Sequence, residues 1–282
     1  MFEGWVGIWR SIQRGFIARW DILSMGVIMQ RVIIYPEPGE TWCAPMINQW
    51  EQPGLILRDK LIAAGYEPIP DHDLKEKPRP NDLAIYFDSL LRPSNVFLHK
   101  RSLYISLEPP CVNPRFYDRI RDFPFSRVLT FHRELCDNKR IFYSPFPVTK
   151  YEMPKQRPPI VGDICAITAN KKSDHPNEMY TVRREVYRAL GSYIDVYGKG
   201  WPDTMSNYKG PVDNIFDTFL RYKYCIVIEN QYVFGYTSEK YFTPIQAGCE
   251  PLIHIGWKPD YTLDDANEGW ASGIVKHLQA IS

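Results

Sequence analysis

The chain has 282 residues, of which 44% are hydrophobic and 24% are charged, and its formal net charge is +1. That composition is typical of a globular protein that buries one large core or two ordinary ones. A net charge so close to zero gives no bulk attraction to a polyanion, so we expect no nucleic-acid partner.

The six cysteines are dispersed, and none of them forms a CxxC pair or a Cys/His cluster with zinc spacing. We therefore expect a reducing, cytoplasmic compartment, and a disulfide between distant cysteines is left open. No stretch of about 18 uncharged apolar residues occurs, so no membrane-spanning helix is predicted.

The N-terminal segment, residues 1–30, is predicted to be an amphipathic extension. Large apolar residues recur at helical spacing over 2–23, whereas Arg10 and Arg14 fall off that stripe. A helix of this kind can lie peripherally in a membrane interface, which is one interpretation. The other interpretation is that the stripe packs on the protein itself or has little role.

A first, acceptor-side α/β domain is predicted over 31–143, because short apolar runs alternate there with helical patterns. This alternation favours a parallel sheet with crossover helices. The expected strands are 31–35, 82–87, 102–107 and 126–131, and the expected helices are 55–64 and 116–122.

A proline-rich passage over 144–159 has little periodicity and is interpreted as an interdomain linker. A second, Rossmann-like domain that binds the nucleotide sugar is predicted over 160–282. Two α/β domains place a ligand in the cleft between them, against the carboxyl ends of the strands. The expected strands are 162–168, 193–197, 224–228 and 251–255, the expected helices are 178–190, 215–222 and 239–247, and at most one helical pattern follows 255.

The most informative segment is 222–248, which reads YKYCIVIENQYVFGYTSEKYFTPIQAG. An apolar strand ends at Glu229-Asn230, a loop follows, and Ser238-Glu239-Lys240 opens a helical pattern. A strand, a polar loop and a helix N-terminus in that order make an anion site at the carboxyl edge of a sheet. A carboxylate beside an ammonium there suits a ligand with hydroxyls and phosphates, such as a sugar nucleotide.

This segment resembles the signature of the α-1,3-fucosyltransferases of glycosyltransferase family 10, and the spacing between its Glu-Asn and Glu-Lys pairs is the same. The resemblance is specific over 161–255 and loose over the first half. It implies a GT-B fold, with two Rossmann-like domains facing across a cleft, and inverting transfer of L-fucose from GDP-β-L-fucose to a glycan hydroxyl. Three more pieces match in order: SLEPP at 106–110, TVRREVYRAL at 181–190 and YIDVYGKG at 193–200.

The resemblance also implies roles for individual residues. Glu108 would be the general base, Glu239 would hold the ribose hydroxyls, and Lys240 and Arg183 would contact the diphosphate. Each has an ordinary alternative. Glu108 could be a turn residue, Glu239 and Lys240 could be a solvated helix start, and Arg183 or its neighbour Arg184 could face solvent.

Five further positions complete the predicted site. Asn230 and Tyr236 would line the pyrophosphate and sugar pocket, again by resemblance. Asn170 and Lys171 follow a predicted strand, where a loop would meet the ligand. Lys199 stands in a turn between two glycines. Each of these last three is either a ligand contact or an ordinary loop residue.

No cofactor or metal ion is predicted to be required. Asp71-His72-Asp73 has the spacing of a metal–diphosphate motif, but it lies in a Pro-rich polar loop and not after a strand at the proposed donor site. Arg183 and Lys240 already supply positive charge for a diphosphate, so a divalent cation is not expected to be essential.

Two other functions stay open. One is a GT-B enzyme that uses another nucleotide sugar, and the other is a catalytically silent protein that binds a nucleotide sugar or a glycan. The segment FHRELCD at 131–137 matches its family counterpart poorly, so the roles of His132 and Arg133 and the identity of the acceptor are not predicted. The presence of every charged residue of the predicted site favours the enzyme.

Overall fold

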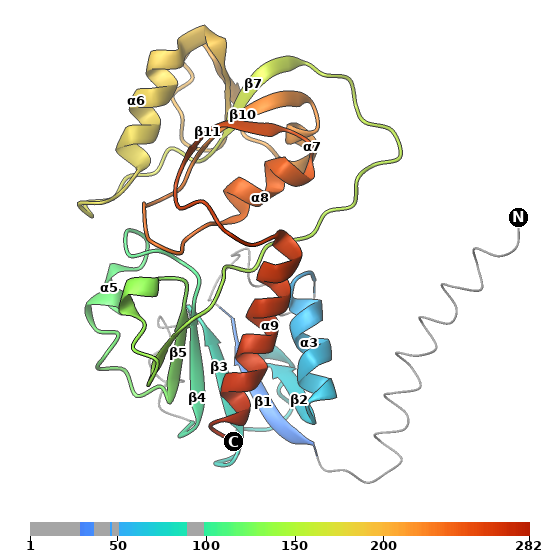
Figure 1. Ribbon diagram of the computed structural model, residues 1–282, viewed down its shortest axis with the longest axis vertical. Coiled ribbons are helices and arrows are strands. Elements are labelled where there is room, and N and C mark those ends of the chain that lie inside the picture. The colour runs from blue at the N-terminus through green and yellow to red at the C-terminus, as the bar shows by residue number, and fades with distance from the viewer. Residues whose placement is uncertain (1–28, 37–45, 47–50, 89–98) are drawn as a thin grey trace, which may run out of the picture.

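The computed structural model describes residues 29–36, 46, 51–88 and 99–282. The chain forms two α/β units, one above the other in Figure 1, and each is built around its own parallel sheet. The predicted amphipathic segment 2–23 lies outside the described residues. Within the described residues, no helix is both long and apolar enough to cross a bilayer.

The first sheet has six parallel strands in the order β2-β1-β3-β4-β5-β6. Every residue of β3 and β4 is buried, as expected for central strands that helices and loops cover on both faces. The strands are β1 Gln30–Tyr35, β2 Tyr66–Pro70, β3 Leu83–Phe87, β4 Ser102–Ser106, β5 Arg127–Thr130 and β6 Ile141–Tyr143.

Every strand predicted for this half is present, but β2 and β6 were not predicted. The β2 sequence, YEPIP, contains two prolines, which cannot donate to a strand ladder and are therefore confined to sheet edges. The β6 strand has only three residues, too few for alternation to be detected. Both are edge strands of this sheet. In this half, the sequence pattern therefore missed only strands that pair with a neighbour on one side.

Among the described residues of the first half, two α-helices flank this sheet. Helix α3, Gly54–Ala63, matches the predicted 55–64 and is followed by Gly65, whose φ of 86° only glycine adopts readily. Helix α5, Pro114–Asp118, begins and ends earlier than the predicted 116–122. Pro114 occupies its first turn, where the missing N–H has no intrahelical partner to lose.

The second sheet has five parallel strands in the order β11-β10-β7-β8-β9. This order is the doubly wound arrangement in which a ligand binds at the carboxyl edge, beside the strand where the winding reverses. The strands are β7 Gly162–Ile167, β8 Asp195–Tyr197, β9 Tyr208–Gly210, β10 Tyr222–Ile228 and β11 Glu250–Ile255.

The helices predicted for the second half are also present. Helix α6, Tyr180–Leu190, packs on one face of the sheet through residues such as Tyr187, and α7, Ile215–Phe219, contributes Phe216 to the core on the other face. Helix α8, Glu239–Gln246, begins at the predicted residue. Helix α7 is shorter than the predicted 215–222 because β10 already begins at Tyr222.

The last helix returns to the first unit. Helix α9, Leu263–Gln279, lies beside α3 over the first sheet (Figure 1), and its fully buried Trp270 packs against Phe87 at 6.0 Å between ring centroids. The amide of Asn267 bonds both the N–H and the C=O of Val148. The sequence assigned all of 160–282 to the second domain, but α9 packs with the first.

The carboxyl ends of the two sheets meet at the junction between the units. The loop after β10 accepts hydrogen bonds from the first unit: Phe234 C=O accepts from Arg133 N–H at 3.1 Å, and Gln231 Oε1 accepts from Cys111 N–H at 2.7 Å. Val233 and Tyr236 from the same loop belong to the hydrophobic core of the first unit. The edges where α/β proteins bind ligands are therefore brought face to face.

Candidate functional site

The site begins where β10 ends and α8 starts. Glu229, the first residue after β10, is fully buried. Both of its carboxylate oxygens accept hydrogen bonds from the same residue, Ser238. Oε1 accepts from the Ser238 N–H at 2.8 Å, and Oε2 accepts from the Ser238 hydroxyl at 2.7 Å. Ser238 is the N-cap of α8 and its Oγ accepts from the Lys240 N–H. The end of the strand is thus tied to the start of the helix.

The predicted pair, Glu239 and Lys240, occupies the first turn of α8. Lys240 Nζ lies 2.7 Å from Glu239 Oε1 and 3.3 Å from Ser238 Oγ. The Lys240 side chain is 19% exposed and that of Glu239 is 44% exposed, so the pair is reachable from solvent but held in place. A helix N-terminus carries unpaired N–H groups and a partial positive charge, so this position favours an anionic ligand.

The electrostatics of the pair keep both groups charged. Burial alone would raise the pKa of the Glu239 carboxyl, but the charge of Lys240 and its hydrogen bond lower that pKa below its ordinary value. Burial would likewise lower the pKa of Lys240, yet the charges of Glu239 and Glu229 raise it. Lys240 therefore stays an ammonium, the state that a phosphate ligand requires.

Arg183 reaches the same edge from α6. Its guanidinium is buried, with Nη2 donating to the Ile228 C=O at 2.7 Å and to Asn230 Oδ1 at 3.3 Å, and Nη1 donating to the Ala169 C=O at 3.3 Å. Its Nε is buried without a hydrogen-bond partner. Arg183 therefore bridges the loops after β7 and β10, and its Nε–H remains uncommitted. Its neighbour Arg184 bonds the Lys171 C=O and the Thr181 hydroxyl instead.

Asn230 and Tyr236 both lie at the junction, in different surroundings. Asn230 is half-buried and contacts Arg183. Tyr236 is almost completely buried, and its ring packs on Phe131 of the first unit at 4.5 Å between centroids. Tyr236 lies in the core that the two units share. Its ring therefore supports the site from behind and does not line an open pocket.

The three further predicted residues lie on the loops after β7 and β8. Asn170 joins the loops, since its N–H donates to the Lys199 C=O at 2.9 Å and its Nδ2 donates to the Gly200 C=O at 2.9 Å. Its Oδ1 is buried without a partner. The side chains of Lys171 and Lys199 are exposed. The structure therefore gives Asn170 a loop-fixing role and leaves the two lysines at the surface of the site.

Glu108 stands at the carboxyl end of β4 in the first unit and is half-buried. Its N–H and that of Leu107 both donate to Asp88 Oδ2, at 3.0 and 2.8 Å, and its C=O accepts from the Tyr117 hydroxyl at 3.0 Å. Asp88 is buried after β3, with a φ of 45° that Asp tolerates better than most residues. The Asp88 carboxylate thus fixes the peptide that carries the predicted base.

The junction brings Glu108 within electrostatic reach of the second unit. Burial raises the pKa of Tyr236 well above its ordinary value, and the charges of Glu229, Glu108 and Glu239 add to that rise. Burial also raises the pKa of the Cys111 thiol to about 11. The structure therefore collects the predicted base and the predicted nucleotide contacts around one interface, although Glu108 lies at least 75 residues before each of these contacts in sequence.

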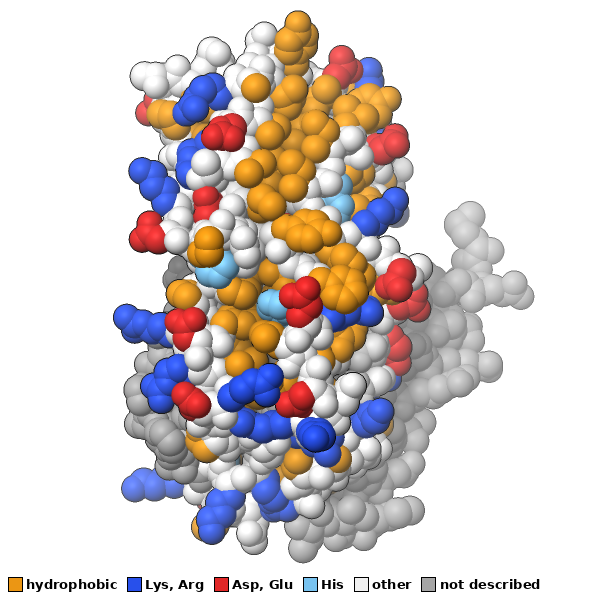
Figure 2. Space-filling view, turned by 60° about the vertical axis from the view of Figure 1, so that its left-hand side comes forward, with side chains coloured by type: hydrophobic (Ala, Val, Ile, Leu, Met, Phe, Trp, Pro, Cys, Tyr) orange, Lys and Arg blue, Asp and Glu red, His pale blue; other side chains and the backbone are white. Residues whose placement is uncertain are grey.

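The segment with the poor match, FHRELCD, also lies at this interface. The Arg133 guanidinium sits 4.1 Å from the ring centroid of Tyr143, 5.1 Å from that of Trp257 and 5.6 Å from that of Phe234. Phe234 is largely exposed. Figure 2 shows hydrophobic side chains that continue down the second unit to the junction. Aromatic rings beside a cation are a surface on which a sugar can stack.

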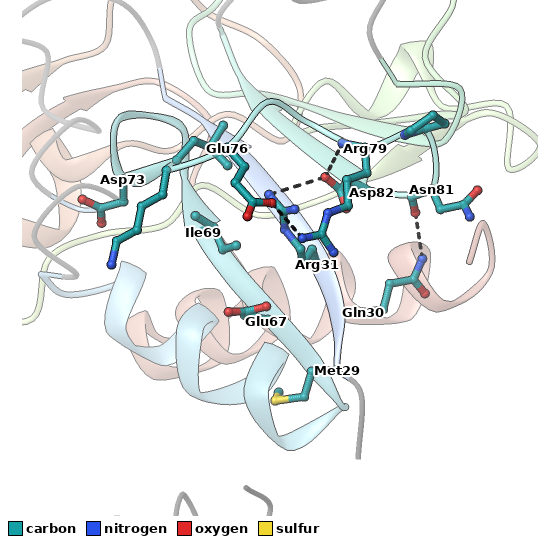
Figure 3. A pocket seen from close by; sticks show the side chains of 13 residues that line it. Met29, Gln30, Arg31, Glu67, Ile69, Asp73, Glu76, Arg79, Asn81 and Asp82 are labelled. Carbon is teal, nitrogen blue, oxygen red and sulfur yellow. Dashed lines mark hydrogen bonds and ion pairs between the residues drawn. The ribbon is translucent and has the colours of Figure 1, made fainter. Parts of the chain in front are cut away.

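The Asp71-His72-Asp73 segment forms a short 3₁₀ turn, and His72 and Asp73 are exposed. Asp73, which follows the carboxyl end of β2, lines a cavity of about 910 Å³ that runs along β1 and β2 of the first sheet (Figure 3), where Arg31 and Asp82 lie 3.6 Å apart. Over 29–36, 51–88 and 99–282, no group of three or more His, Cys, Asp or Glu side chains is placed to hold a metal ion.

No protein-family model matches the chain, and no curated protein matches it by sequence. A solved α1,3-fucosyltransferase is similar in structure, with a TM-score of 0.50 at 14% identity, covering 91% of this chain and 80% of that one. The chain has a GT-B-like α/β fold. An α1,3-fucosyltransferase solved with GDP gives 0.47 at 16% identity (91% and 81% covered), and the glycotransferase of kitacinnamycin gives 0.38 at 13% identity (90% and 94% covered).

The likeness at these identities concerns the fold alone, and it agrees with the two Rossmann-like domains predicted from the sequence. Two functional candidates, Asp88 and Glu229, were not assigned a role by sequence reasoning. Each is the first polar residue after a predicted strand, which is the one signal that could have indicated them. Whether such a side chain turns inward depends on contacts that no local pattern contains.

Proposed function

We propose that this protein is an inverting glycosyltransferase that transfers L-fucose from GDP-β-L-fucose to a hydroxyl of a glycan acceptor, in an α-1,3-type linkage. The observation that carries the proposal is the Glu239–Lys240 pair at the N-terminus of α8, next to buried Arg183 and opposite Glu108. Cations on one side and a carboxylate on the other are what an inverting displacement needs.

The donor side would stabilise the leaving group. As the glycosidic bond breaks, the diphosphate gains negative charge while the sugar becomes oxocarbenium-like. Lys240 commits two of its three ammonium hydrogens to Glu239 and Ser238, which leaves the third for a phosphate oxygen. Charges fixed at the place where charge develops lower the barrier most effectively. The Glu239 carboxylate would accept from the ribose hydroxyls, and Arg183 would add its Nε donor.

The acceptor side would supply the base. The acceptor hydroxyl loses its proton as it attacks the anomeric carbon, and the Glu108 carboxylate would accept that proton from the face opposite the diphosphate. A base positioned within hydrogen-bond reach contributes about 10²–10⁴-fold to the rate. Asp88 and Tyr117 hold the backbone of Glu108, so its side chain leaves the sheet edge from a fixed point.

The reaction needs no cofactor beyond the donor substrate, because Lys240 and Arg183 supply the positive charge for the diphosphate. One observation favours a second candidate, a GT-B enzyme with a different nucleotide sugar. The residues proposed as donor contacts would contact the ribose, the phosphates and the sugar, and none is proposed to contact the nucleobase. The nucleobase and the sugar of the donor are therefore to be identified by experiment.

The test is a panel of donors given to the full-length protein, with GDP binding measured by calorimetry and donor turnover by nucleotide release. We expect GDP-fucose to be turned over faster than GDP-mannose or UDP sugars. Glu108→Gln should bind GDP as the wild type does but lose about 10²–10⁴-fold in turnover. Lys240→Ala should weaken GDP binding and turnover together, because it removes a phosphate charge.

Glu76→Gln serves as the matched control, since Glu76 is an exposed carboxylate of the first unit that pairs with Arg79 and belongs to no proposed contact. It should change neither GDP binding nor turnover. Turnover of UDP sugars alone would replace the proposal with the second candidate. A Glu108→Gln protein that transfers sugar at the wild-type rate would remove Glu108 from the mechanism.

A further inference from the structure

Glu229 is a buried carboxylate to which the proposed mechanism gives no role. It has no exposed surface, and its two oxygens are both spent on Ser238 rather than on a cation. Burying a carboxylate is costly unless it is fully hydrogen-bonded. An apolar residue at this position would avoid that cost. Packing alone therefore does not explain why residue 229 is a glutamate.

A chain of hydrogen bonds runs from this carboxylate to the proposed phosphate contact. The Ser238 hydroxyl donates to Glu229 Oε2 at 2.7 Å, and its Oγ accepts from both the N–H and the Nζ of Lys240 at 3.3 Å. A hydroxyl has one hydrogen. Because both Lys240 groups are donors, the hydroxyl hydrogen of Ser238 must be donated to an acceptor elsewhere. The Glu229 carboxylate is that acceptor.

We propose that Glu229 is a positioning residue, which holds Ser238 so that the first turn of α8 presents Lys240 and Glu239 to a nucleoside diphosphate. The inference rests on the proposed function and deepens it, since it names what fixes the donor contacts. Glu229 does not touch the ligand. It acts through Ser238, by fixing where the helix begins and in which direction the ammonium points.

The chemistry of the contact requires a carboxylate. Ser238 offers Glu229 two donors, its N–H and its hydroxyl, so both side-chain termini of residue 229 must be acceptors. Glutamine has the same shape but one terminus is an NH₂ donor, which would face a donor of Ser238 in either orientation. Glu229→Gln is therefore a small change in volume that breaks one of the two bonds.

The surrounding backbone keeps the carboxylate in place. The Glu229 N–H donates to the Ile255 C=O at 2.9 Å, which joins its backbone to the end of β11. The side chain packs on Gly256 so closely that a Cβ there would approach Glu229 Cγ to 2.7 Å. The side chain has no room to swing away, so the position of Ser238 follows from the position of the two strand ends.

The first experiment compares Glu229→Gln, Glu229→Asp and Ser238→Ala with the wild type for GDP affinity and for kcat and KM with GDP-fucose. We expect Glu229→Gln and Ser238→Ala to weaken GDP binding and raise the donor KM by about 10–100-fold, the size expected for a lost hydrogen bond to a charged group. Glu229→Asp, which keeps both acceptors, should recover part of the loss.

A double mutant separates positioning from general damage to the fold. If Glu229 acts through Lys240, its substitution should matter much less once Lys240 is absent, because residues that act in one network are not additive. We expect Glu229→Gln to cost less than about 3-fold in GDP affinity in the Lys240→Ala background. An equal fold-loss in both backgrounds would show a purely structural role and overturn the proposal.

Hydrogen exchange provides a readout that does not depend on the proposed function. Amides of residues 238–241 should exchange at least about 10-fold faster in Glu229→Gln than in the wild type, while those of β10 stay unchanged. Asp265→Asn, which changes the cap of α9 in the same way, should leave GDP affinity and 238–241 exchange unchanged. Unchanged exchange at 238–241 in Glu229→Gln overturns the positioning role, whereas a wild type that binds no GDP overturns only the proposed function.

Discussion

Two buried carboxylates have the same task on opposite sides of the junction. Asp88 accepts from the N–H groups of Leu107 and Glu108 in the first unit, and Glu229 accepts from Ser238 in the second. Each follows a central strand and holds the backbone of the loop or helix start that carries a proposed site residue. A carboxylate with two backbone or hydroxyl donors is satisfied without a cation, which leaves the site's positive charge available for a ligand.

Substitution of Asp88 should separate the two sides of the site. We expect Asp88→Asn to weaken one of the bonds to Leu107 and Glu108, and thereby to lower kcat by about 10-fold through a misplaced base. GDP affinity should stay as in the wild type, because Asp88 accepts from Tyr104, Leu107 and Glu108, which all belong to the first unit. Steady-state kinetics with calorimetry measures both quantities, and a loss of GDP affinity equal to the loss of kcat would contradict this division.

At this scale a motif could predict where residues lie. The Glu239–Lys240 pair and Arg183 lie together at the edge of the second sheet, and Glu108 lies at a strand end, whereas the roles of these residues stay predictions. The sequence did not predict the burial of Tyr236 in the shared core. Its partner Phe131 belongs to the other unit, and no local pattern identifies a contact across so many residues.

At the scale of elements, the central strands and the edge strand β11 were predicted, whereas the edge strands β2, β6 and β9 were not. Strands β3, β4 and β10 contain apolar runs because most of their residues are buried. The edge strands β2 and β9 contain proline or glycine and are short, so their sequences look like loops. Helix α9 was predictable as a helix, but its return to the first unit was not.

The attachment of α9 should depend on pH through His277. Burial and the charge of Arg127 lower the pKa of His277 to about 4, and its Nδ1 lies 2.7 Å from Arg127 Nη1. A donor faces that nitrogen, so the folded state needs the neutral ring. A depressed folded pKa means that this stabilisation is complete above the ordinary value of 6.5 and is lost as pH falls from 6.5 towards 4.

Thermal unfolding measured across that pH range tests this. We expect the unfolding midpoint of the wild type to fall between pH 6.5 and 4, with an uptake of up to roughly one proton due to His277. Burial also lowers the pKa values of His99, His132 and His254, so they add to the same trend. The contribution of His277 is the difference from His277→Gln, and equal pH slopes in the two proteins would rule it out.

At the scale of the whole molecule, function depends on how the two units are joined. Among the described residues, the connections between them include the 144–159 passage, the return of α9 to the first sheet, the loop after β7, whose Ser173 hydroxyl donates to the Cys111 C=O, and the loop after β10 that enters the first unit's core. The loop after β10 contacts the proposed site directly. Because it carries residues from Asn230 to Tyr236, a shift of the units would move the donor contacts relative to Glu108, and the distance between base and leaving group would change with it.

Arg133 is the side chain whose loss should loosen this junction. Its guanidinium lies over Tyr143 of the first unit and over Phe234 and Trp257 of the second, and a cation–π contact contributes about 0.5–2 kcal/mol. We expect Arg133→Ala to lower the unfolding midpoint and to broaden or split the calorimetric transition, because the two cores would unfold less cooperatively. Turnover should fall more than GDP affinity, since the donor contacts belong to the second unit.

The matched control for that experiment is Arg119→Ala. Arg119 lies over Phe123 at 5.6 Å, so it makes the same kind of contact, but both residues belong to the first unit and the Arg119 side chain is mostly exposed. Its loss should leave a single transition and normal turnover. If Arg133→Ala also kept a single sharp transition and full turnover, the cation at the junction would not couple the two units. The relative placement of base and donor would then depend on the other connections between the units.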